Sequence, residues 1–198
     1  DKFEDAFAKF CNTQFAVSCS NGTTALHLAL LGCGVTAGDE VLVSTTTNMA
    51  TFFAVEYIGA VPIPVDINGD TYTICLEDLV EKITDKTKAI LCVHLFGQLC
   101  EMHSLMEIAN RYGLKVIEDC AEAHGASNNG KRAGSFGHAS AFSFFSNKLL
   151  TCGEGGIVTT NDADVARRVR SLKSLAFGTD NKFLHEAVGY NYRLSNIS

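Results

Sequence analysis

The chain has 198 residues, of which 46% are hydrophobic and 19% are charged, a composition that supports one large domain with a substantial core and excludes a disordered chain. The formal net charge is −6 and no run of consecutive basic residues occurs, so neither a nucleic acid nor a membrane surface is an expected partner. No signal peptide and no apolar stretch long enough to span a bilayer is visible, which predicts a cytoplasmic protein with a small ligand.

Apolar, β-branched runs recur along the chain and predict strands. Most of them lack polar alternation, which is typical of strands covered on both faces by helices. The runs occupy residues 15–20, 40–44, 61–65, 88–95, 115–119, 139–145 and 156–160. Helical patterns lie between most of them, at residues 23–31, 49–58, 76–83, 102–112 and 163–175. The alternation predicts a three-layer α/β/α fold with a mostly parallel sheet of about seven strands.

The eight cysteines predict reduced thiols in the core. They are dispersed through mostly apolar segments, with no CxxC pair and no close histidine spacing. A disulfide framework or a zinc site would need such a pattern, and the histidines also lack metal-ligand spacing. We therefore expect neither disulfides nor a metal.

Lys148 is the residue that points most clearly to chemistry. It ends an aromatic, strand-like run at residues 141–147 and precedes a glycine-rich turn at residues 153–156. An ammonium group is poorly solvated in such a place, and desolvation favours the neutral, nucleophilic amine. Carbonyl cofactors such as pyridoxal phosphate are the usual target of such a lysine. Taken alone, an ordinary surface lysine at a strand end is the alternative.

The sequence SNGTTAL at residues 20–26 predicts a strand-to-helix turn that could bind an anion. Gly22 permits close approach to the backbone, the helix start offers unpaired amides, and the hydroxyls of Thr23 and Thr24 can add hydrogen bonds. Phosphate is the obvious ligand for such a turn. Simple capping of the helix by a residue before Gly22 explains the same pattern equally well.

Two later segments also place polar groups where an α/β sheet would put a site, just beyond the ends of strands. Asp119 ends an apolar run, where a buried acid needs a cation or a donor, and a protonated pyridine nitrogen would suit it. An exposed or capping acid is the alternative there. The segment at residues 188–194 groups an amide, two phenols and the guanidinium of Arg193, which suits a phosphate, a carboxylate or a structural salt bridge.

Together these segments resemble the DegT/DnrJ/EryC1/StrS family of sugar-nucleotide aminotransferases, which belong to fold type I of the pyridoxal-phosphate enzymes. The resemblance covers nearly the whole chain through SNGTTALHLAL, AGDEVLVS, GAVPIPVDI, TKAILCVHLFGQ, VIEDCAEAHGA, GSFGHASAFSFFSNKLLTCGEGG and VGYNYRLSNI. SNGTTALHLAL, SNK and GYNYR look closest to the GDP-perosamine synthase branch. The resemblance implies that residues 1–198 form the cofactor-binding large domain, without the extreme N-terminus and the small C-terminal domain of the family.

Carried over by position, the resemblance implies that Lys148 forms the Schiff base with pyridoxal 5'-phosphate and carries the proton between cofactor and sugar. Asp119 would pair with the pyridine nitrogen, and Glu122 would lie near the 3'-oxygen of the ring. The cofactor phosphate would be bound by Gly22, Thr23, Thr24, Ser143 and, across a homodimer with a shared active site, by Asn191 of the other subunit with support from Arg193. Asn48 departs from the family pattern, because an aromatic residue that stacks on the pyridine ring is common there.

The implied reaction is transamination of a nucleotide-linked keto-deoxy sugar, a 4-keto-6-deoxyhexose, with glutamate as amino donor. A sugar 3-dehydratase on the same scaffold is one alternative, although that branch replaces the lysine with histidine, and Lys148 argues against it. A non-catalytic regulatory protein that keeps the cofactor is the other. Because the small domain helps to close the site in the family, residues 1–198 alone are not expected to be a complete enzyme.

Overall fold

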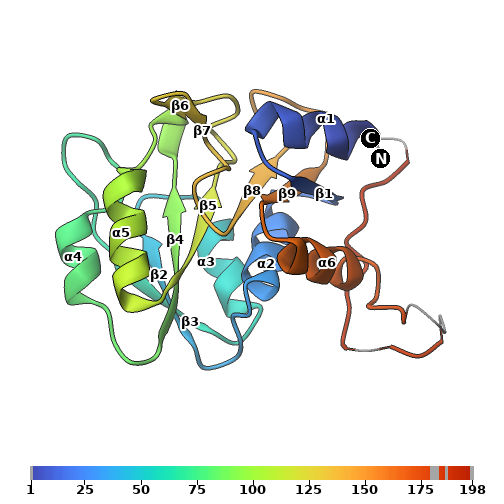
Figure 1. Ribbon diagram of the computed structural model, residues 1–198, viewed down its shortest axis with the longest axis horizontal. Coiled ribbons are helices and arrows are strands. Elements are labelled where there is room, and N and C mark those ends of the chain that lie inside the picture. Colours follow the sequence, from blue (N-terminus) through green and yellow to red (C-terminus); the bar gives the residue numbers. More distant parts are fainter. Residues whose placement is uncertain (1, 179–182, 186, 197–198) are drawn as a thin grey trace.

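A seven-stranded sheet forms the middle layer of the structure, a computed structural model that describes residues 2–178, 183–185 and 187–196 (Figure 1). Its strands are β1 (Phe15–Cys19), β2 (Glu40–Ser44), β3 (Val61–Val65), β4 (Thr87–Val93), β5 (Lys115–Asp119), β8 (Ala139–Ser143) and β9 (Gly156–Thr160). They lie across the sheet in the order β1-β9-β8-β5-β4-β2-β3. A separate short hairpin consists of β6 (Ser127–Asn128) and β7 (Lys131–Arg132).

Most neighbouring strands of the sheet run parallel. The pairs β3-β2, β2-β4, β4-β5 and β5-β8 are parallel, whereas β9 runs antiparallel to both of its neighbours, β1 and β8. Parallel neighbours need long crossover connections, which the helices provide. The predicted α/β fold with a mostly parallel, seven-stranded sheet is confirmed.

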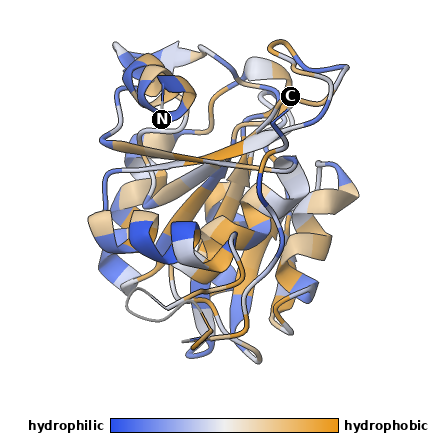
Figure 2. Ribbon diagram, turned by 90° about the vertical axis from the view of Figure 1, so that its right-hand side faces the viewer, coloured by the Kyte–Doolittle hydropathy of each residue, from blue (hydrophilic) through white to orange (hydrophobic). Residues whose placement is uncertain are grey.

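Helices cover both faces of the sheet, which confirms the three layers (Figure 1). On one face, α1 (Lys2–Cys11), α4 (Leu76–Glu81) and α5 (Met102–Tyr112) pack into one hydrophobic cluster. On the other face, α2 (Gly22–Gly32), α3 (Met49–Glu56) and α6 (Ala163–Leu172) pack into a second cluster. Figure 2 shows hydrophobic residues concentrated along the central strands between these layers. No helix formed by the described residues is long and apolar enough to cross a membrane.

Successive residues of β5 face opposite layers of the fold. Val116 packs into the cluster of α1, α4 and α5, whereas Ile117 packs into the cluster of α2, α3 and α6, because side chains alternate along a strand. The same alternation continues to the end of the strand. Glu118 bonds to His94 after β4, and Asp119 bonds to Thr51 of α3. The two adjacent carboxylates therefore lie on opposite faces of the sheet.

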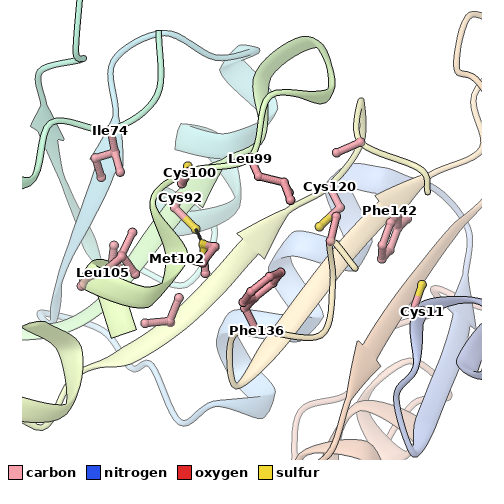
Figure 3. Packing of buried hydrophobic residues seen from close by; sticks show 14 of the residues in the cluster. Cys11, Ile74, Cys92, Leu99, Cys100, Met102, Leu105, Cys120, Phe136 and Phe142 are labelled. Atoms are coloured by element: carbon pink, nitrogen blue, oxygen red, sulfur yellow. Dashed lines mark hydrogen bonds between the residues drawn. The ribbon is translucent and has the colours of Figure 1, made fainter. Parts of the chain in front are cut away.

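The first cluster is rich in sulfur. Cys92 and Cys100 lie close to Met102 in this layer, and Cys120 and Cys11 of α1 extend the same cluster (Figure 3). All eight cysteines are free thiols, and most are buried, as expected for core residues. Burial raises the pKa of Cys11 to about 12, so this thiol stays protonated and unreactive.

Two predicted strands end two residues earlier in the structure than in the sequence pattern, and the run at residues 15–20 ends one residue earlier, at Cys19. The run at residues 88–95 leaves the sheet early because the chain turns in a 3₁₀ segment in which Phe96 adopts a left-handed conformation, with φ 51° and ψ 27°. The run at residues 139–145 leaves the sheet after Ser143. There the N–H of Phe144 donates to the carbonyl of Gly155 at 2.8 Å, which directs the chain toward Lys148.

Glu118 joins three segments of the first layer. Its Oε1 accepts hydrogen bonds from the N–H groups of Phe136 and Gly137 at 2.8 and 2.7 Å, and its Oε2 accepts from the N–H of Gly134 at 2.9 Å. Nε2 of His94 lies 3.0 Å from the same Oε2. His94, Glu118 and Cys120 place potential metal ligands within 4.8 Å of one another, but hydrogen-bond donors already occupy both oxygens of Glu118. This cluster is thus explained by the fold.

Replacing Glu118 should unfold the protein at lower denaturant concentration. Glu118→Ala leaves three backbone N–H groups and His94 without their buried acceptor, so we expect a loss of about 3 to 5 kcal/mol in the free energy of unfolding. Urea unfolding followed by circular dichroism measures it. Glu107→Ala, on the exposed face of α5, is the matched control and should stay within about 0.5 kcal/mol of the wild type. Equal losses in both variants would contradict the role assigned to Glu118.

Candidate active site

A cavity of about 350 Å³ opens at the carboxyl ends of β5 and β8, between the first turns of α2 and α3. Such an edge is where open α/β sheets bind ligands, because the loops after parallel strands diverge there. Asp119 at the end of β5 and Lys148 beyond β8 both line the cavity. Two residues that lie 29 positions apart in the sequence numbering are thus brought to one site.

Asp119 is a buried carboxylate held by two neutral donors. Its Oδ1 accepts a hydrogen bond from the N–H of Ala121 at 3.1 Å, and its Oδ2 accepts one from the hydroxyl of Thr51 at 2.9 Å. Burial raises the pKa of Asp119. The two hydrogen bonds and the more distant His94 and Lys148 lower this pKa, but the effect of burial is larger. No ion pair joins Asp119 to a cation among the residues that the structure describes. A buried acid in this state suits a cationic ligand group.

Lys148 points its amine at Glu122. Nζ of Lys148 lies 3.6 Å from Oε1 of Glu122, and the lysine side chain is only 19% exposed. The segment that carries Lys148 is fixed locally, because its N–H donates to the carbonyl of Phe145 at 2.9 Å. Oε2 of Glu122 accepts a hydrogen bond from the N–H of Phe96 at 3.0 Å. Glu122 therefore connects the lysine to the turn that follows β4.

The start of α2 combines a helix cap with free amides. Asn21 caps the helix: its side chain accepts from the N–H of Thr24, and the Thr24 hydroxyl accepts from the N–H of Asn21. The N–H groups of Gly22 and Thr23, both of which line the cavity, have no hydrogen-bond partner among the described residues. The capping by Asn21 is therefore present, and the two unpaired amides beside the cavity are compatible with the predicted anion site.

Gly22 is required by the close approach of β8. A Cβ atom at this position would lie 2.7 Å from Cβ of Ser143, a distance that real Cβ atoms do not reach. The Ser143 hydroxyl accepts a hydrogen bond from the N–H of Phe145 at 3.3 Å, which leaves its own proton free for a ligand. Gly22, Thr23 and Ser143 thus form one wall of the cavity.

Of the other residues singled out in the sequence, Thr24, Glu122 and Asn191 do not line the cavity, whereas Asn48 does. Thr24 does not line the cavity, because its amide and hydroxyl are used in the cap. Asn191 is exposed and also lies outside the cavity of its own chain; Nε and Nη2 of Arg193 donate to its Oδ1 at 3.3 and 3.0 Å. Asn48 lines the cavity and caps α3 by accepting from the N–H of Ala50 at 3.0 Å, so this position offers no aromatic ring.

Sequence reasoning missed Thr51. This residue lies in the first turn of α3, is fully buried and donates to Asp119. Its Oγ1 also lies 2.7 Å from Oγ1 of Thr47, which precedes the cap of α3. The only signal in the sequence was the pair of threonines four residues apart, which occurs in many helix starts.

The chain matches the model of the DegT/DnrJ/EryC1/StrS aminotransferase family over residues 1–198. It belongs to this family. It is 48% identical to GDP-perosamine synthase of Escherichia coli O157:H7 over 99% of its own length and 54% of that protein. Among solved structures, an aminotransferase from Psychrobacter cryohalolentis superposes with a TM-score of 0.95 at 40% identity, over 99% of this chain and 52% of the other. NtdA from Bacillus subtilis, with bound cofactor PMP, gives a TM-score of 0.90 at 34% identity, over 99% of this chain and 45% of NtdA. The chain spans about half the length of the curated relatives it matches.

The family membership makes a substitution at Gly22 informative. Gly22→Ala should weaken binding of a phosphate ligand in this cavity about tenfold, because the added Cβ collides with Ser143 and displacing a packed backbone costs about 1 to 3 kcal/mol. Alanine favours helices over glycine, so the helix itself should not suffer. Fluorescence titration of the intact protein measures the affinity. The matched control is Gly69→Ala, where a Cβ would meet nothing within 4 Å; a loss as large in this control would contradict the argument.

Proposed function

We propose that the protein transfers an amino group from glutamate to the keto group of a nucleotide-linked keto-deoxy sugar, with pyridoxal 5'-phosphate as cofactor. One observation carries this proposal: a shielded amine, a buried carboxylate and unpaired helix amides line or border a single cavity. Each of these groups suits a different part of the cofactor. The support for a sugar substrate is the similarity to the synthase described above.

The residues of the cavity fit this cofactor. The free N–H groups of Gly22 and Thr23 and the helix dipole of α2 suit a phosphate, and Ser143 can add a donor. Asp119, which has no cationic partner among the described residues, suits the pyridine nitrogen of the ring. Lys148 supplies the amine that reacts with an aldehyde.

When bound, pyridoxal phosphate supplies the aldehyde and the ring that withdraws electrons from the carbon being deprotonated. The protein contributes orientation and proton transfer. Lys148 would be the nucleophile toward the aldehyde and, after the amino donor displaces its amine, the base and acid that moves a proton at the reacting carbon. Glu122, 3.6 Å from Nζ, gives the released ammonium a charge partner and holds it beside the cavity. Asp119 would hold the ring nitrogen in its charged form.

The finer assignments follow from the resemblance and from the position of individual residues. We propose a 4-keto-6-deoxyhexose as the sugar, in line with the perosamine synthase branch. We also propose a homodimer in which Asn191 serves the phosphate of the neighbouring subunit, because it is exposed and lies outside the cavity of its own chain. The half of the relatives that this chain does not span would supply the small domain. Free thiols throughout the chain support a reducing compartment, the cytoplasm.

Lys148→Ala should abolish covalent attachment of the cofactor. Wild-type protein incubated with pyridoxal 5'-phosphate and reduced with borohydride should carry a pyridoxyl group on the peptide that contains Lys148. Before reduction, the visible absorption band of the bound cofactor should be present in the wild type and absent in the variant. Peptide mass mapping measures the adduct. Lys9→Ala, an exposed lysine on α1, is the control and should label like the wild type. An adduct that persists in Lys148→Ala and maps to another lysine would overturn the assignment.

Turnover should distinguish the three candidate functions. The intact protein, given a GDP-linked 4-keto-6-deoxymannose and glutamate, should release one 2-oxoglutarate for each amino sugar formed, and Lys148→Ala should release none. Coupled assay of 2-oxoglutarate and mass spectrometry of the sugar measure both products. Loss of water from the sugar without 2-oxoglutarate would identify a dehydratase. Bound cofactor without any turnover would instead favour a regulatory protein.

A further inference from the structure

We propose that Thr51 is a positioning residue for Asp119, and that its hydroxyl, backed by the hydroxyl of Thr47, orients the carboxylate and keeps it ionised at the base of the cavity. The ligand named here, a pyridine nitrogen, rests on the proposed function. The hydroxyl pair and the carboxylate are features of the structure itself.

Thr51 is the side chain that determines how Asp119 points. Among the described residues it provides the only side-chain hydrogen bond to this carboxylate, from Oγ1 to Oδ2 at 2.9 Å. The other bond, from the N–H of Ala121 to Oδ1, comes from the backbone just beyond the same strand. Thr51 belongs instead to α3, so its bond fixes the carboxylate relative to a different element of the cavity wall.

When Asp119 is ionised, the directions of the hydrogen bonds made by the two hydroxyls are fixed. A carboxylate can only accept, so Thr51 must donate its single proton to Oδ2. The oxygen of Thr51, 2.7 Å from that of Thr47, then accepts the proton of Thr47. Both O–H dipoles therefore point toward the negative charge. Thr47 is only half-buried, so its own oxygen remains open to a donor from solvent. Hydrogen bonds aligned in this way strengthen one another.

Other groups near Asp119 do not replace this pair. Lys148 from the segment after β8 and His94 from the end of β4 favour the ionised form from a greater distance, whereas the neighbouring Cys120 is a neutral thiol whose pKa is raised by burial. Burial opposes ionisation most strongly. The hydrogen bond from Thr51 to the ionised carboxylate lowers the pKa of Asp119 and so opposes the effect of burial directly at Oδ2.

The first test is a carbon-13 titration of the Asp119 carboxyl in the cofactor-free intact protein, with the signal assigned through Asp119→Asn. Valine has nearly the shape of threonine but no hydroxyl, so Thr51→Val should move the titration midpoint upward by about one pH unit, the loss expected for one hydrogen bond to a charged group. Thr51→Ser, which keeps the hydroxyl, should restore the wild-type midpoint. Thr47→Val should move it less, because its hydroxyl acts through Thr51.

The sign of the effect on stability follows from the same titration. A carboxyl whose pKa is raised by folding stabilises the folded protein at pH values below its normal pKa, and this advantage disappears as the pH rises through the raised value. Removing the Thr51 donor raises that value further. Thr51→Val should therefore lose more thermal stability relative to the wild type at neutral pH than at low pH, whereas a simple packing defect would lower stability equally at both.

The second test uses pyridoxamine 5'-phosphate, which cannot form an imine with Lys148 and so isolates the contact with Asp119. Thr51→Val should bind it about tenfold more weakly than the wild type at neutral pH. An analogue in which carbon replaces the ring nitrogen should bind equally well to Thr51→Val and to the wild type. Thr45→Val is the control: this threonine is exposed, and no hydrogen bond of its side chain occurs among the described residues.

The outcomes separate the two proposals. If neither protein binds pyridoxamine 5'-phosphate, the proposed function fails, while the titration still decides the role of Thr51. An Asp119 midpoint that is the same in Thr51→Val and the wild type would overturn the role of Thr51, whatever the affinity for the cofactor. So would an equal loss of affinity for the ring-nitrogen and ring-carbon compounds, since that result indicates a general distortion of the cavity.

Discussion

The candidate site depends on how the end of β5 is held. Glu118 and Asp119 are adjacent acids that point to opposite faces of the sheet, and each is buried. Glu118 is satisfied by three backbone N–H groups and by His94, which makes it a fixed part of the fold. Asp119 has only two neutral donors. The fully satisfied carboxylate therefore fixes the strand end, and the partly satisfied one is left to a ligand.

The topology explains why the reactive groups meet at this place. β5 lies between β4 and β8, and all three run parallel, so the segments that follow them emerge at the same edge of the sheet. The turn at Phe96 follows β4, Asp119 ends β5 and Lys148 follows β8. The starts of α2 and α3 complete the cavity from the second layer. The site thus needs both the central strands and the helices of one face.

Much of this arrangement could be predicted from the sequence because it follows from local patterns. The apolar runs and the helical patterns between them predicted the layers and most of the element positions. The position of Asp119 and Lys148 at one edge follows from strand order. The Thr51 hydrogen bond could not be predicted, because it joins residues 68 positions apart that meet only when α3 packs on the sheet. The use of Thr24 in a cap also depended on its actual side-chain geometry, since a threonine at a helix start can serve a ligand or the helix.

The turn after β4 also helps to hold Lys148 in place, through Glu122. Phe96 adopts a left-handed conformation, which costs a residue with a side chain about 1 kcal/mol or more. Its N–H donates to Glu122, and a bond to an ionised acceptor is strong enough to offset such a cost. Glu122 is also the charge partner of Lys148. The carboxylate of Glu122 therefore supports two features together, the turn after β4 and the position of the amine, so the backbone at Phe96 and the lysine are mechanically linked through one side chain.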